Sequence, residues 1–368
     1  MGSAKAPPRR LIDRVLGQDR VKAIIGADLR AGRLTHALLL SGPAGVGKQV
    51  VARAVAQALL CSTSHPSGWG CGGCRDCQEV EAGTHPDCHW LEAAAGQRLG
   101  IDELRGWVQS VVALRPVRGG SRVGVLVGAD RATEAGQNML LKSLEEPPAS
   151  TTWILVTESP AGLLPTIRSR CQHVTLGVLP VHEVAEWLKA QGVKAEVAAT
   201  AARLSGGRPG VAWDLSQPEA AARRNLVVDW VLALREATAT ELFRQAEEWA
   251  EAPDLPARLE ILALCLRDLT VLTGPRDVVA GEDEFQAGAL LVPELVQRQS
   301  GMGGARRGRI RDGRPRDPAA ARAFLALAEQ ADGLARRAGQ LGSPRLSLDA
   351  LFLDLRSAWH KCAGSSSG

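Results

Sequence analysis

A glycine-rich octapeptide carries the clearest chemical signature in this chain. Residues 42–49 read Gly-Pro-Ala-Gly-Val-Gly-Lys-Gln, close to the G-x-x-x-x-G-K-[ST] pattern of phosphate-binding loops. In such a loop Gly42, Gly45 and Gly47 let backbone N–H groups turn toward phosphate oxygens, and Lys48 reaches the β and γ oxygens. The segment therefore predicts a degenerate phosphate-binding loop.

The side chains that would hold Mg²⁺ are missing from this pattern. Gln49 replaces the Ser or Thr hydroxyl, and an amide is a poor substitute in a tight octahedral shell. The apolar run 123–127 should end in acidic residues, but it continues into Gly128, Ala129 and Asp130. Asp130 lies three residues beyond the expected position, so we do not expect it to replace the missing ligand. These losses predict a site without hydrolysis.

Two interpretations of the loop stay open. The glycines can be needed only for packing of a strand-turn-helix unit. Alternatively, the site keeps ATP or ADP without turnover, because Lys48 is intact and phosphate needs only N–H groups and a cation. We favour the second interpretation, with Mg²⁺ held weakly or not at all.

Four cysteines form a second chemical cluster. Cys61, Cys71, Cys74 and Cys77 follow the spacing C-x9-C-x2-C-x2-C, which suits one tetrahedral Zn²⁺ site. Four sulfur ligands leave no open position for water, so the predicted zinc is structural. Two alternatives are four free thiols in a loop and His65 as a competing ligand.

Composition limits the function classes. The chain has 368 residues, a net charge of +4, 45% hydrophobic and 23% charged residues, as in ordinary soluble globular proteins. It contains no run of 18 apolar residues and no apolar signal core near its start, so we expect a cytoplasmic protein without membrane contact.

The elements that must position these residues change in type along the chain. Residues 1–177 alternate strand and helix patterns, with strands at 36–40, 123–127 and 153–156 and a helix at 49–60, which predicts an α/β core with a parallel sheet. Residues 178–218 predict a small helical unit, with helices at 181–191 and 195–204. Residues 219–362 predict an all-helical domain. Its expected helices span 223–235, 237–250, 255–272 and 319–341.

Two further segments stand apart by composition. Residues 300–317 are rich in Gly and Arg and predict a mobile loop. A solvated insertion is favoured there over a contact with DNA phosphates. Residues 363–368 predict a disordered tail.

Several longer motifs converge on one family. The stretch 138–148 reads N-M-L-L-K-S-L-E-E-P-P, residues 164–171 read L-P-T-I-R-S-R-C, and His85-Pro86-Asp87 follows the cysteine cluster. Together with the glycine loop, this combination resembles bacterial clamp-loader subunits of the AAA+ superfamily across the whole chain. The resemblance implies an AAA+ P-loop core, a helical lid and a helical collar. Glu145 and Glu146 resemble catalytic acids, but Pro147 indicates a helix end instead.

Within that family the sequence resembles the non-hydrolysing delta-prime type more than the gamma/tau motor type. Gln49 replaces the hydroxyl, and the motor's Asp-Glu pair falls on Val127 and Gly128. The motor's lid arginine falls near Gly210, with Arg208 two residues early. The resemblance implies a hetero-oligomeric ring of five subunits. Its partners would be gamma/tau and delta subunits and, through them, the sliding clamp and primer-template DNA.

The same resemblance gives Arg170 a role in a neighbouring subunit. It implies an arginine finger, whose guanidinium stabilises charge on the γ-phosphate of an adjacent ATP site. The alternative is an ion pair between Arg170 and a local carboxylate. Two other functions are alternatives, a hydrolysing clamp-loader motor with unusual ligands and a free-standing zinc-dependent nucleic-acid binder. The modest net charge counts against the second.

Overall fold

The computed structural model describes residues 10–63, 65–93, 97–112, 115–118, 120–234, 236–273, 318–338 and 343–364. Contacts divide the chain into two compact units. Unit 1 is Met1–Trp187 with Gly207–Val211, and unit 2 is Leu188–Gly206 with Ala212–Gly368. The division falls inside the expected lid, and the three expected domain boundaries stay predictions.

Unit 1 is built on a five-stranded parallel sheet. The strands are β1 (Ala37–Ser41), β2 (Cys88–Glu92), β3 (Arg122–Val127), β4 (Thr151–Thr157) and β5 (Gln172–Thr175). Their order across the sheet is β2-β3-β4-β1-β5, and every neighbouring pair is parallel. β1 therefore lies between β4 and β5, and the loop that follows β1 opens at the carboxyl edge of the sheet.

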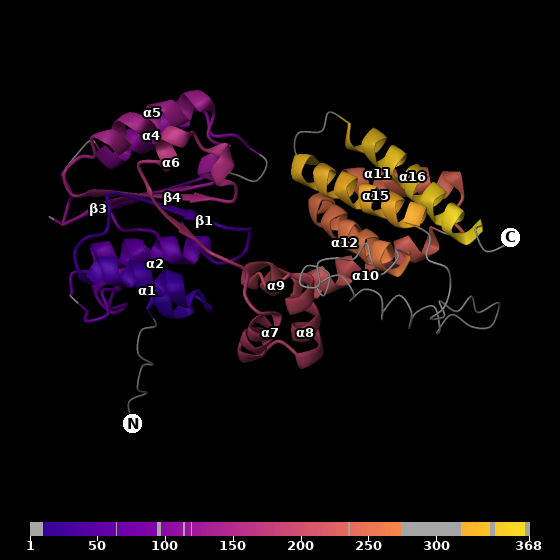
Figure 1. Cartoon of the computed structure of the whole chain (residues 1–368), viewed down its shortest axis with the longest axis horizontal. Helices are drawn as coiled ribbons and strands as arrows, with labels where there is room; N and C mark the ends of the chain where they lie inside the picture. The colour runs from indigo at the N-terminus through magenta and orange to yellow at the C-terminus, as the bar shows by residue number, and fades with distance from the viewer. Residues whose placement is uncertain are drawn as a thin grey trace. The chain divides into compact units, whose positions relative to one another are not determined.

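Helices cover both faces of this sheet (Figure 1). One face carries α1 (Asp19–Arg30) and α2 (Lys48–Leu60), and the other carries α4 (Ile101–Val112), α5 (Glu134–Glu145) and α6 (Pro165–Arg168). Because side chains alternate along a strand, Leu38 and Leu40 pack in the core under α2, whereas Leu39 packs in the core under α4. Burial on both faces explains why β1 reads as a continuous apolar run.

Shorter elements complete unit 1. They are the 3-10 turns η1 (Leu11–Arg14), η2 (Ala129–Arg131) and η3 (Pro160–Gly162), together with α3 (Arg75–Ala82) and α7 (Val181–Ala190). α7 runs past the end of unit 1 at Trp187.

The predicted strands and the helix of the core are present with small shifts of their ends. Strand 36–40 is observed at Ala37–Ser41, strand 153–156 at Thr151–Thr157, and helix 49–60 at Lys48–Leu60. β2 and β5 were not predicted. Both lie at sheet edges and keep half-exposed polar side chains, so they lack the apolar run of a buried strand.

Unit 2 is helical throughout its described residues. It contains α8 (Ala195–Leu204), α10 (Pro218–Ala233), α11 (Ala239–Glu251), α12 (Leu255–Thr273), α15 (Pro318–Arg337) and α16 (Pro344–Gly364), and α9 (Pro209–Leu215) enters it at Ala212. Its core contains a tilted aromatic group in which Trp230 lies 4.1 Å from Phe352 and 5.1 Å from Trp249, measured between ring centroids. Such aromatic pairs add to the stabilisation from apolar burial.

The helical prediction for this region is confirmed, with two differences. α10 begins at Pro218 instead of residue 223, because proline is well suited to a first helical turn. α16 continues to Gly364, so the expected disordered tail does not begin at 363. The Arg-rich segment 300–317 lies outside the described residues.

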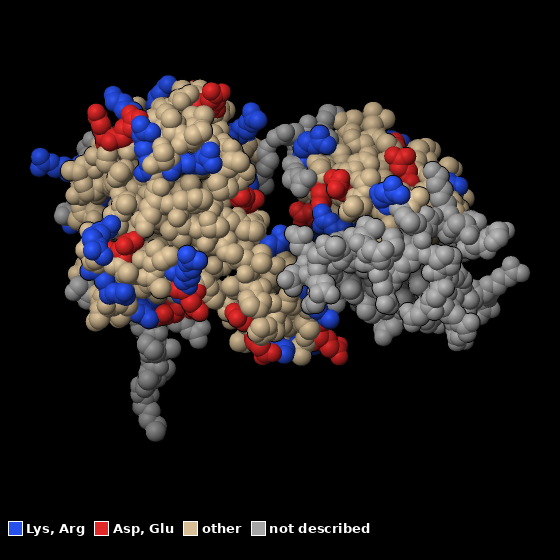
Figure 2. Space-filling model, viewed as in Figure 1, with Lys and Arg blue, Asp and Glu red and all other residues tan. Residues whose placement is uncertain are grey.

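The described surface carries charges of both signs. On the visible face of unit 1, Lys and Arg side chains alternate with Asp and Glu (Figure 2). Among the described helices, none combines the length and the apolar character that a bilayer crossing requires.

Candidate functional site

A cavity of about 450 Å³ opens at the carboxyl edge of the sheet in unit 1. Four strands deliver residues to it. The phosphate-binding loop follows β1, Glu92 ends β2, Gly128 follows β3, and Glu158 follows β4. Ligand sites of open α/β sheets lie at this edge, where strand order reverses. The predicted loop is therefore placed where a nucleotide site is expected.

The glycines of the loop are required by its backbone. Gly42 has φ of +144°, and a Cβ there would lie 2.3 Å from the carbonyl oxygen of Leu176. At Gly45, with φ of +76°, a Cβ would lie 2.9 Å from the backbone nitrogen of Val211. A larger residue at either position would displace the backbone atoms that it meets. Both glycines are therefore needed for packing of the strand-turn-helix unit.

Lys48 begins α2 and is only 7% exposed. Its Nζ donates to the carbonyl oxygens of Gly42, at 2.7 Å, and Pro43, at 2.6 Å. Burial lowers the pKa of Lys48, and the nearby carboxylates of Glu158 and Asp130 oppose that shift. Two of the three ammonium donors are used by the loop, which leaves one for a phosphate oxygen.

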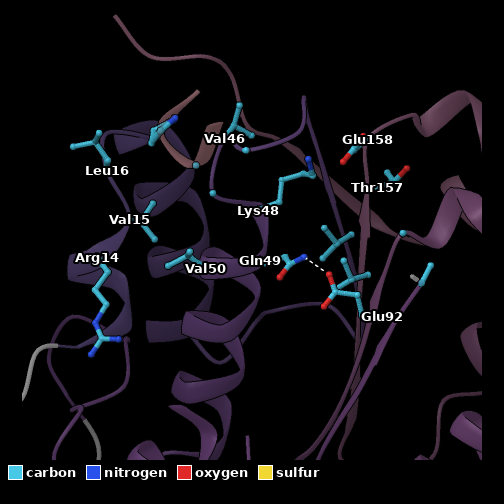
Figure 3. Close-up of a pocket in the computed structure, with 18 of the residues that line it drawn as sticks. Arg14, Val15, Leu16, Val46, Lys48, Gln49, Val50, Glu92, Thr157 and Glu158 are labelled. Carbon is cyan, nitrogen blue, oxygen red and sulfur yellow. Dashed lines mark hydrogen bonds between the residues drawn. The ribbon is translucent and has the colours of Figure 1, made fainter. Parts of the chain in front are cut away.

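Gln49 is held by a carboxylate on the opposite wall of the cavity. Its Nε2 donates to Glu92 Oε1 at 2.7 Å (Figure 3). Because a carboxylate can only accept, this contact fixes the amide with its N–H₂ group toward Glu92. The position that would supply a metal-binding hydroxyl thus carries an amide whose Nε2 is bonded to Glu92, and only its Oε1 remains to face a cation.

The end of β3 offers no acid to the cavity, as predicted. Val127 and Gly128 both line it, and the first carboxylate beyond them is Asp130 in η2. Asp130 Oδ1 is buried and accepts no hydrogen bond from the residues that the structure describes. Asp130 and Glu92 do not converge with Glu158 into a three-ligand cluster within the described part of the chain.

The segment that would carry the motor's lid arginine packs on the loop backbone. Gly210 N donates to Gly45 O at 2.8 Å, and a Cβ at Gly210 would lie 3.1 Å from that oxygen. Pro209 and Gly210 line the cavity, whereas Arg208 is not among its described lining residues.

The apolar end of the cavity has no signature in the sequence. It is lined by Arg14 at the end of η1, by Val15 and Leu16 directly after it, and by Trp187 of α7. These residues have no motif, and only the fold brings them beside a loop about 30 residues or more away in sequence. An aromatic and aliphatic wall of this kind suits the flat ring of a nucleobase.

The four predicted cysteines come together at one point. Their Sγ atoms all lie within 4.8 Å of one another. Cys61 Sγ lies 3.8 Å from Cys74 Sγ, and Cys71 Sγ lies 3.9 Å from Cys77 Sγ. Four sulfurs at about 2.3 Å from a tetrahedral Zn²⁺ would be roughly 3.8 Å apart. The observed spacing fits that ion, and His65 is not part of the cluster.

Backbone N–H groups point at these sulfurs. Cys74 N donates to Cys71 Sγ at 3.3 Å, and Cys77 N donates to Cys74 Sγ at 3.4 Å. Although burial opposes it, the backbone donor of Cys77 contributes to lowering the pKa of Cys74 to about 6, whereas burial raises the pKa of Cys61 and that of Cys77. Donors to sulfur favour the thiolate form, which is the form that binds metal.

An ion-pair network links α3, which contains Cys77, to the segment that precedes β3. Arg118 pairs with Asp76 and Glu79 of α3, with Arg118 Nη2 at 2.6 Å from Glu79 Oε2. His85 Nε2 lies 3.4 Å from Asp76 Oδ1. Asp76, Glu79 and His85 are close enough to hold a metal ion, but the guanidinium of Arg118 already supplies the positive charge there.

Arg170 follows α6 and pairs within its own chain. Its Nη2 lies 2.6 Å from Glu145 Oε1, and its Nη1 donates to Thr166 O at 3.0 Å. The local carboxylate named as the alternative partner is therefore present. Both side chains remain solvent accessible, at 36% and 47% exposure, and Arg170 is not among the described residues that line the cavity.

Comparisons with known proteins agree with the resemblance. The family model described as "DNA polymerase III, delta subunit" matches residues 17–180. The chain is 40% identical over 194 residues to DNA polymerase III subunit delta' of Escherichia coli, which covers 52% of this chain and 57% of that protein. It is 33% identical over 246 residues to the delta' subunit of Haemophilus influenzae, covering 66% and 74%.

The gamma/tau type is also related, over a smaller part. The chain is 37% identical over 166 residues to DNA polymerase III subunit gamma/tau of Mycobacterium bovis, which covers 45% of this chain and 28% of that protein. The parallel sheet with helices on both faces and the helices of unit 2 confirm the predicted α/β core with helical domains. The delta' relatives share more of their length with this chain, and the chain belongs to the DNA polymerase III delta' subunit family.

Proposed function

We propose that this chain is a non-hydrolysing subunit of the clamp loader that places a sliding clamp on primed DNA. The observation that carries the proposal is the Gln49–Glu92 hydrogen bond beside an intact phosphate-binding loop. This bond ties the residue that replaces the Mg²⁺-binding hydroxyl to Glu92, while Val127 and Gly128 bring no acid to the cavity. Phosphoryl transfer depends on such a metal, so the loop is expected to lack turnover.

The cavity is expected to hold a nucleotide without hydrolysing it. Its size, the buried ammonium of Lys48, and the N-terminus of α2 suit phosphates, and the wall around Leu16 and Trp187 suits a base. The loop glycines are also required for packing, so their presence alone does not support binding.

Arg170 is proposed to act on a neighbouring gamma/tau subunit as an arginine finger. Its pairing with Glu145 does not prevent this, because ion pairs between exposed side chains contribute only about 0–1 kcal/mol. A phosphate with developing negative charge would compete well for the same guanidinium. In this role Arg170 lowers the barrier for phosphoryl transfer in a site that its own chain does not contain.

The other partners follow from the same family. We propose a five-membered hetero-oligomer in the cytoplasm that contains gamma/tau and delta subunits and, through them, contacts the sliding clamp and primer-template DNA. The core, lid (178–218) and collar (219–362) are its proposed domains. In that assembly this chain would be a rigid element against which ATP-driven subunits move.

The cysteine cluster is proposed to hold one structural Zn²⁺. The sulfur–sulfur distances and the N–H donors to Cys71 and Cys74 support it. With four thiolates the ion has no open position for catalysis. Its expected effect is to fix the loop between α2 and α3.

The test is the ATPase rate of the reconstituted complex with an Arg170→Ala subunit. We expect a loss of roughly 10³-fold in the hydrolysis contributed by the adjacent site, as for other arginine fingers. Arg168→Ala, an exposed arginine at the end of α6 and two residues before Arg170, is the matched control and should leave the rate unchanged. Glu145→Gln should also leave it intact, since it only frees Arg170. An unchanged rate in a properly assembled Arg170→Ala complex would refute the finger.

One observation favours a second candidate, an active gamma/tau-type motor with unusual ligands. Asp130 Oδ1 is buried beside the cavity without a hydrogen-bond donor among the described residues, as a metal ligand would be. This candidate predicts ATP hydrolysis by the isolated chain that is lost in Asp130→Asn.

A further inference from the structure

A buried glutamine of α2 joins two segments that lie far from it in sequence. Gln57 is only 1% exposed, in a helix whose other buried side chains are apolar apart from Lys48. Its Oε1 accepts a hydrogen bond from Leu11 N at 3.2 Å, and its Nε2 donates to Cys77 O at 3.1 Å. Burying an amide is costly unless both of its ends are bonded. Here the two bonds connect η1 with α3, the helix that contains one of the four clustered cysteines.

The loop that carries Cys71 packs against the same region through two glycines. A Cβ at Gly70 would lie 2.9 Å from the carbonyl oxygen of Gln57. A Cβ at Gly72, whose φ is +71°, would lie 3.1 Å from the Cα atom of Arg10. The two glycines flank Cys71, so a metal ion that fixes its sulfur also fixes the backbone that packs on Gln57 and Arg10.

The segment that is contacted in this way, residues 10–16, continues into the cavity. Its last three residues line one wall there (Figure 3). Arg14 also pairs with Glu81 of α3, but both side chains are exposed, and exposed ion pairs contribute little. The buried bonds of Gln57 are therefore the stronger link between segment 10–16 and the cysteine cluster.

We propose that Gln57 is the positioning residue through which a metal ion at the four cysteines holds segment 10–16, and with it one wall of the cavity. The inference rests on the proposed structural Zn²⁺ and adds what that ion fixes beyond its own loop. Residues that hold metal ligands in place, without touching the metal, commonly change metal affinity by about 10–100-fold. The coupling is reciprocal, so the bonds that tighten the hold on zinc are also the bonds that zinc stabilises.

Hydrogen exchange of the zinc-loaded full chain tests this link in Gln57→Met, which keeps a side chain of similar length but removes both bonds. We expect segment 10–16 to exchange about tenfold faster in this variant, while β1 keeps its wild-type rate. Transfer of zinc to a chromogenic chelator should also be roughly tenfold faster. Unchanged exchange of the segment, or faster exchange that extends to β1, would overturn the inference.

Gln137→Met is the matched control. Gln137 is also buried, at 5% exposure, but its amide bonds to Ala132, Gly162 and Leu164. We expect this variant to change neither the rate of zinc release nor the exchange of segment 10–16. A wild-type chain that takes up no zinc would refute the proposed ion itself. A wild-type chain that binds zinc, but whose segment 10–16 stays equally protected after chelation, would overturn the link alone.

Discussion

The phosphate-binding loop and the cysteine cluster are both sequence motifs, but the structure supports them in different ways. The loop keeps its backbone, because Gly42 and Gly45 are packed against Leu176 and Val211. Its metal-binding side chain has been replaced by one that bonds to Glu92. At the cluster, by contrast, the side chains themselves converge, and backbone donors point at their sulfurs.

This difference shows which residues of a motif indicate its chemical activity. Glycines are needed in a loop wherever its backbone passes close to another segment. They therefore indicate the backbone conformation of the loop and not an activity. Four cysteines have no comparable packing reason to lie within 4.8 Å of one another. The glycines of the loop therefore do not show what the site does, and its chemistry has to be inferred from Gln49 and Glu92. The chemistry of the cluster can be inferred directly from its four sulfur ligands.

The largest effect is expected at the cluster. Structural zinc contributes on the order of 10 kcal/mol to folding in small domains, so Cys77→Ser should remove several kcal/mol of stability and the bound metal. Metal content by mass spectrometry and the unfolding temperature with and without chelator check this. Cys88→Ser, outside the cluster, is the control. A wild-type chain that contains no zinc when prepared with it would contradict the proposed ion.

The second-largest effect tests whether the phosphate-binding loop needs Gly42 for its packing. Gly42→Ala should destabilise the chain by roughly 3 kcal/mol, because its Cβ meets the carbonyl oxygen of Leu176 at 2.3 Å. Gly83→Ala is the matched control, since Gly83 also has positive φ, of +71°, but open space around it, and should cost only about 1 kcal/mol. Chemical denaturation measures both. Equal losses would mean that the loop does not need Gly42 for packing.

A smaller effect is expected at the ion pair between Arg118 and Asp76, beside the cysteine cluster. The Arg118 guanidinium holds the pKa of Asp76 below its ordinary value. Asp76→Asn should lower the unfolding temperature by a few degrees at neutral pH. Because the pKa is depressed on folding, this stabilisation exists above the unfolded pKa and is lost as pH falls through the folded one. The wild type and Asp76→Asn should therefore converge in strongly acidic buffer, and a constant difference would contradict the assignment.

The smallest effect concerns Gln49 alone. Gln49→Thr restores a hydroxyl but not the missing acid at Val127 or Gly128, so we expect hydrolysis to stay undetectable. A phosphate-release assay with the full chain checks this. Measurable turnover would show that Gln49 was the only obstacle to catalysis.

The sequence predicted those parts of the structure that depend on local patterns. β1 and β3 are buried on both faces and read as apolar runs, and α8 was predicted at its observed residues, 195–204. The convergence of the four cysteines was also predictable from spacing. The half-exposed edge strand β2 was missed because its five residues mix polar and apolar types.

The contacts that decide function could not be predicted in this way. Gln49 meets Glu92 across 43 positions of sequence, and only the parallel pairing of β2 with β3 brings that carboxylate to the cavity. The pairing of Arg170 with Glu145 was anticipated only as an unnamed carboxylate. Val15 and Trp187 carry no motif, so their place in the cavity follows from the fold alone.

ATP hydrolysis by the purified full chain, with Mg²⁺ and primed DNA present, tests the central claim most directly. We expect no turnover above the buffer background, because Gln49 lacks the metal-binding hydroxyl and neither Val127 nor Gly128 supplies an acid. The same background rate is then expected for Lys48→Ala. Clear turnover that Lys48→Ala abolishes would contradict this account and identify the chain as a motor subunit.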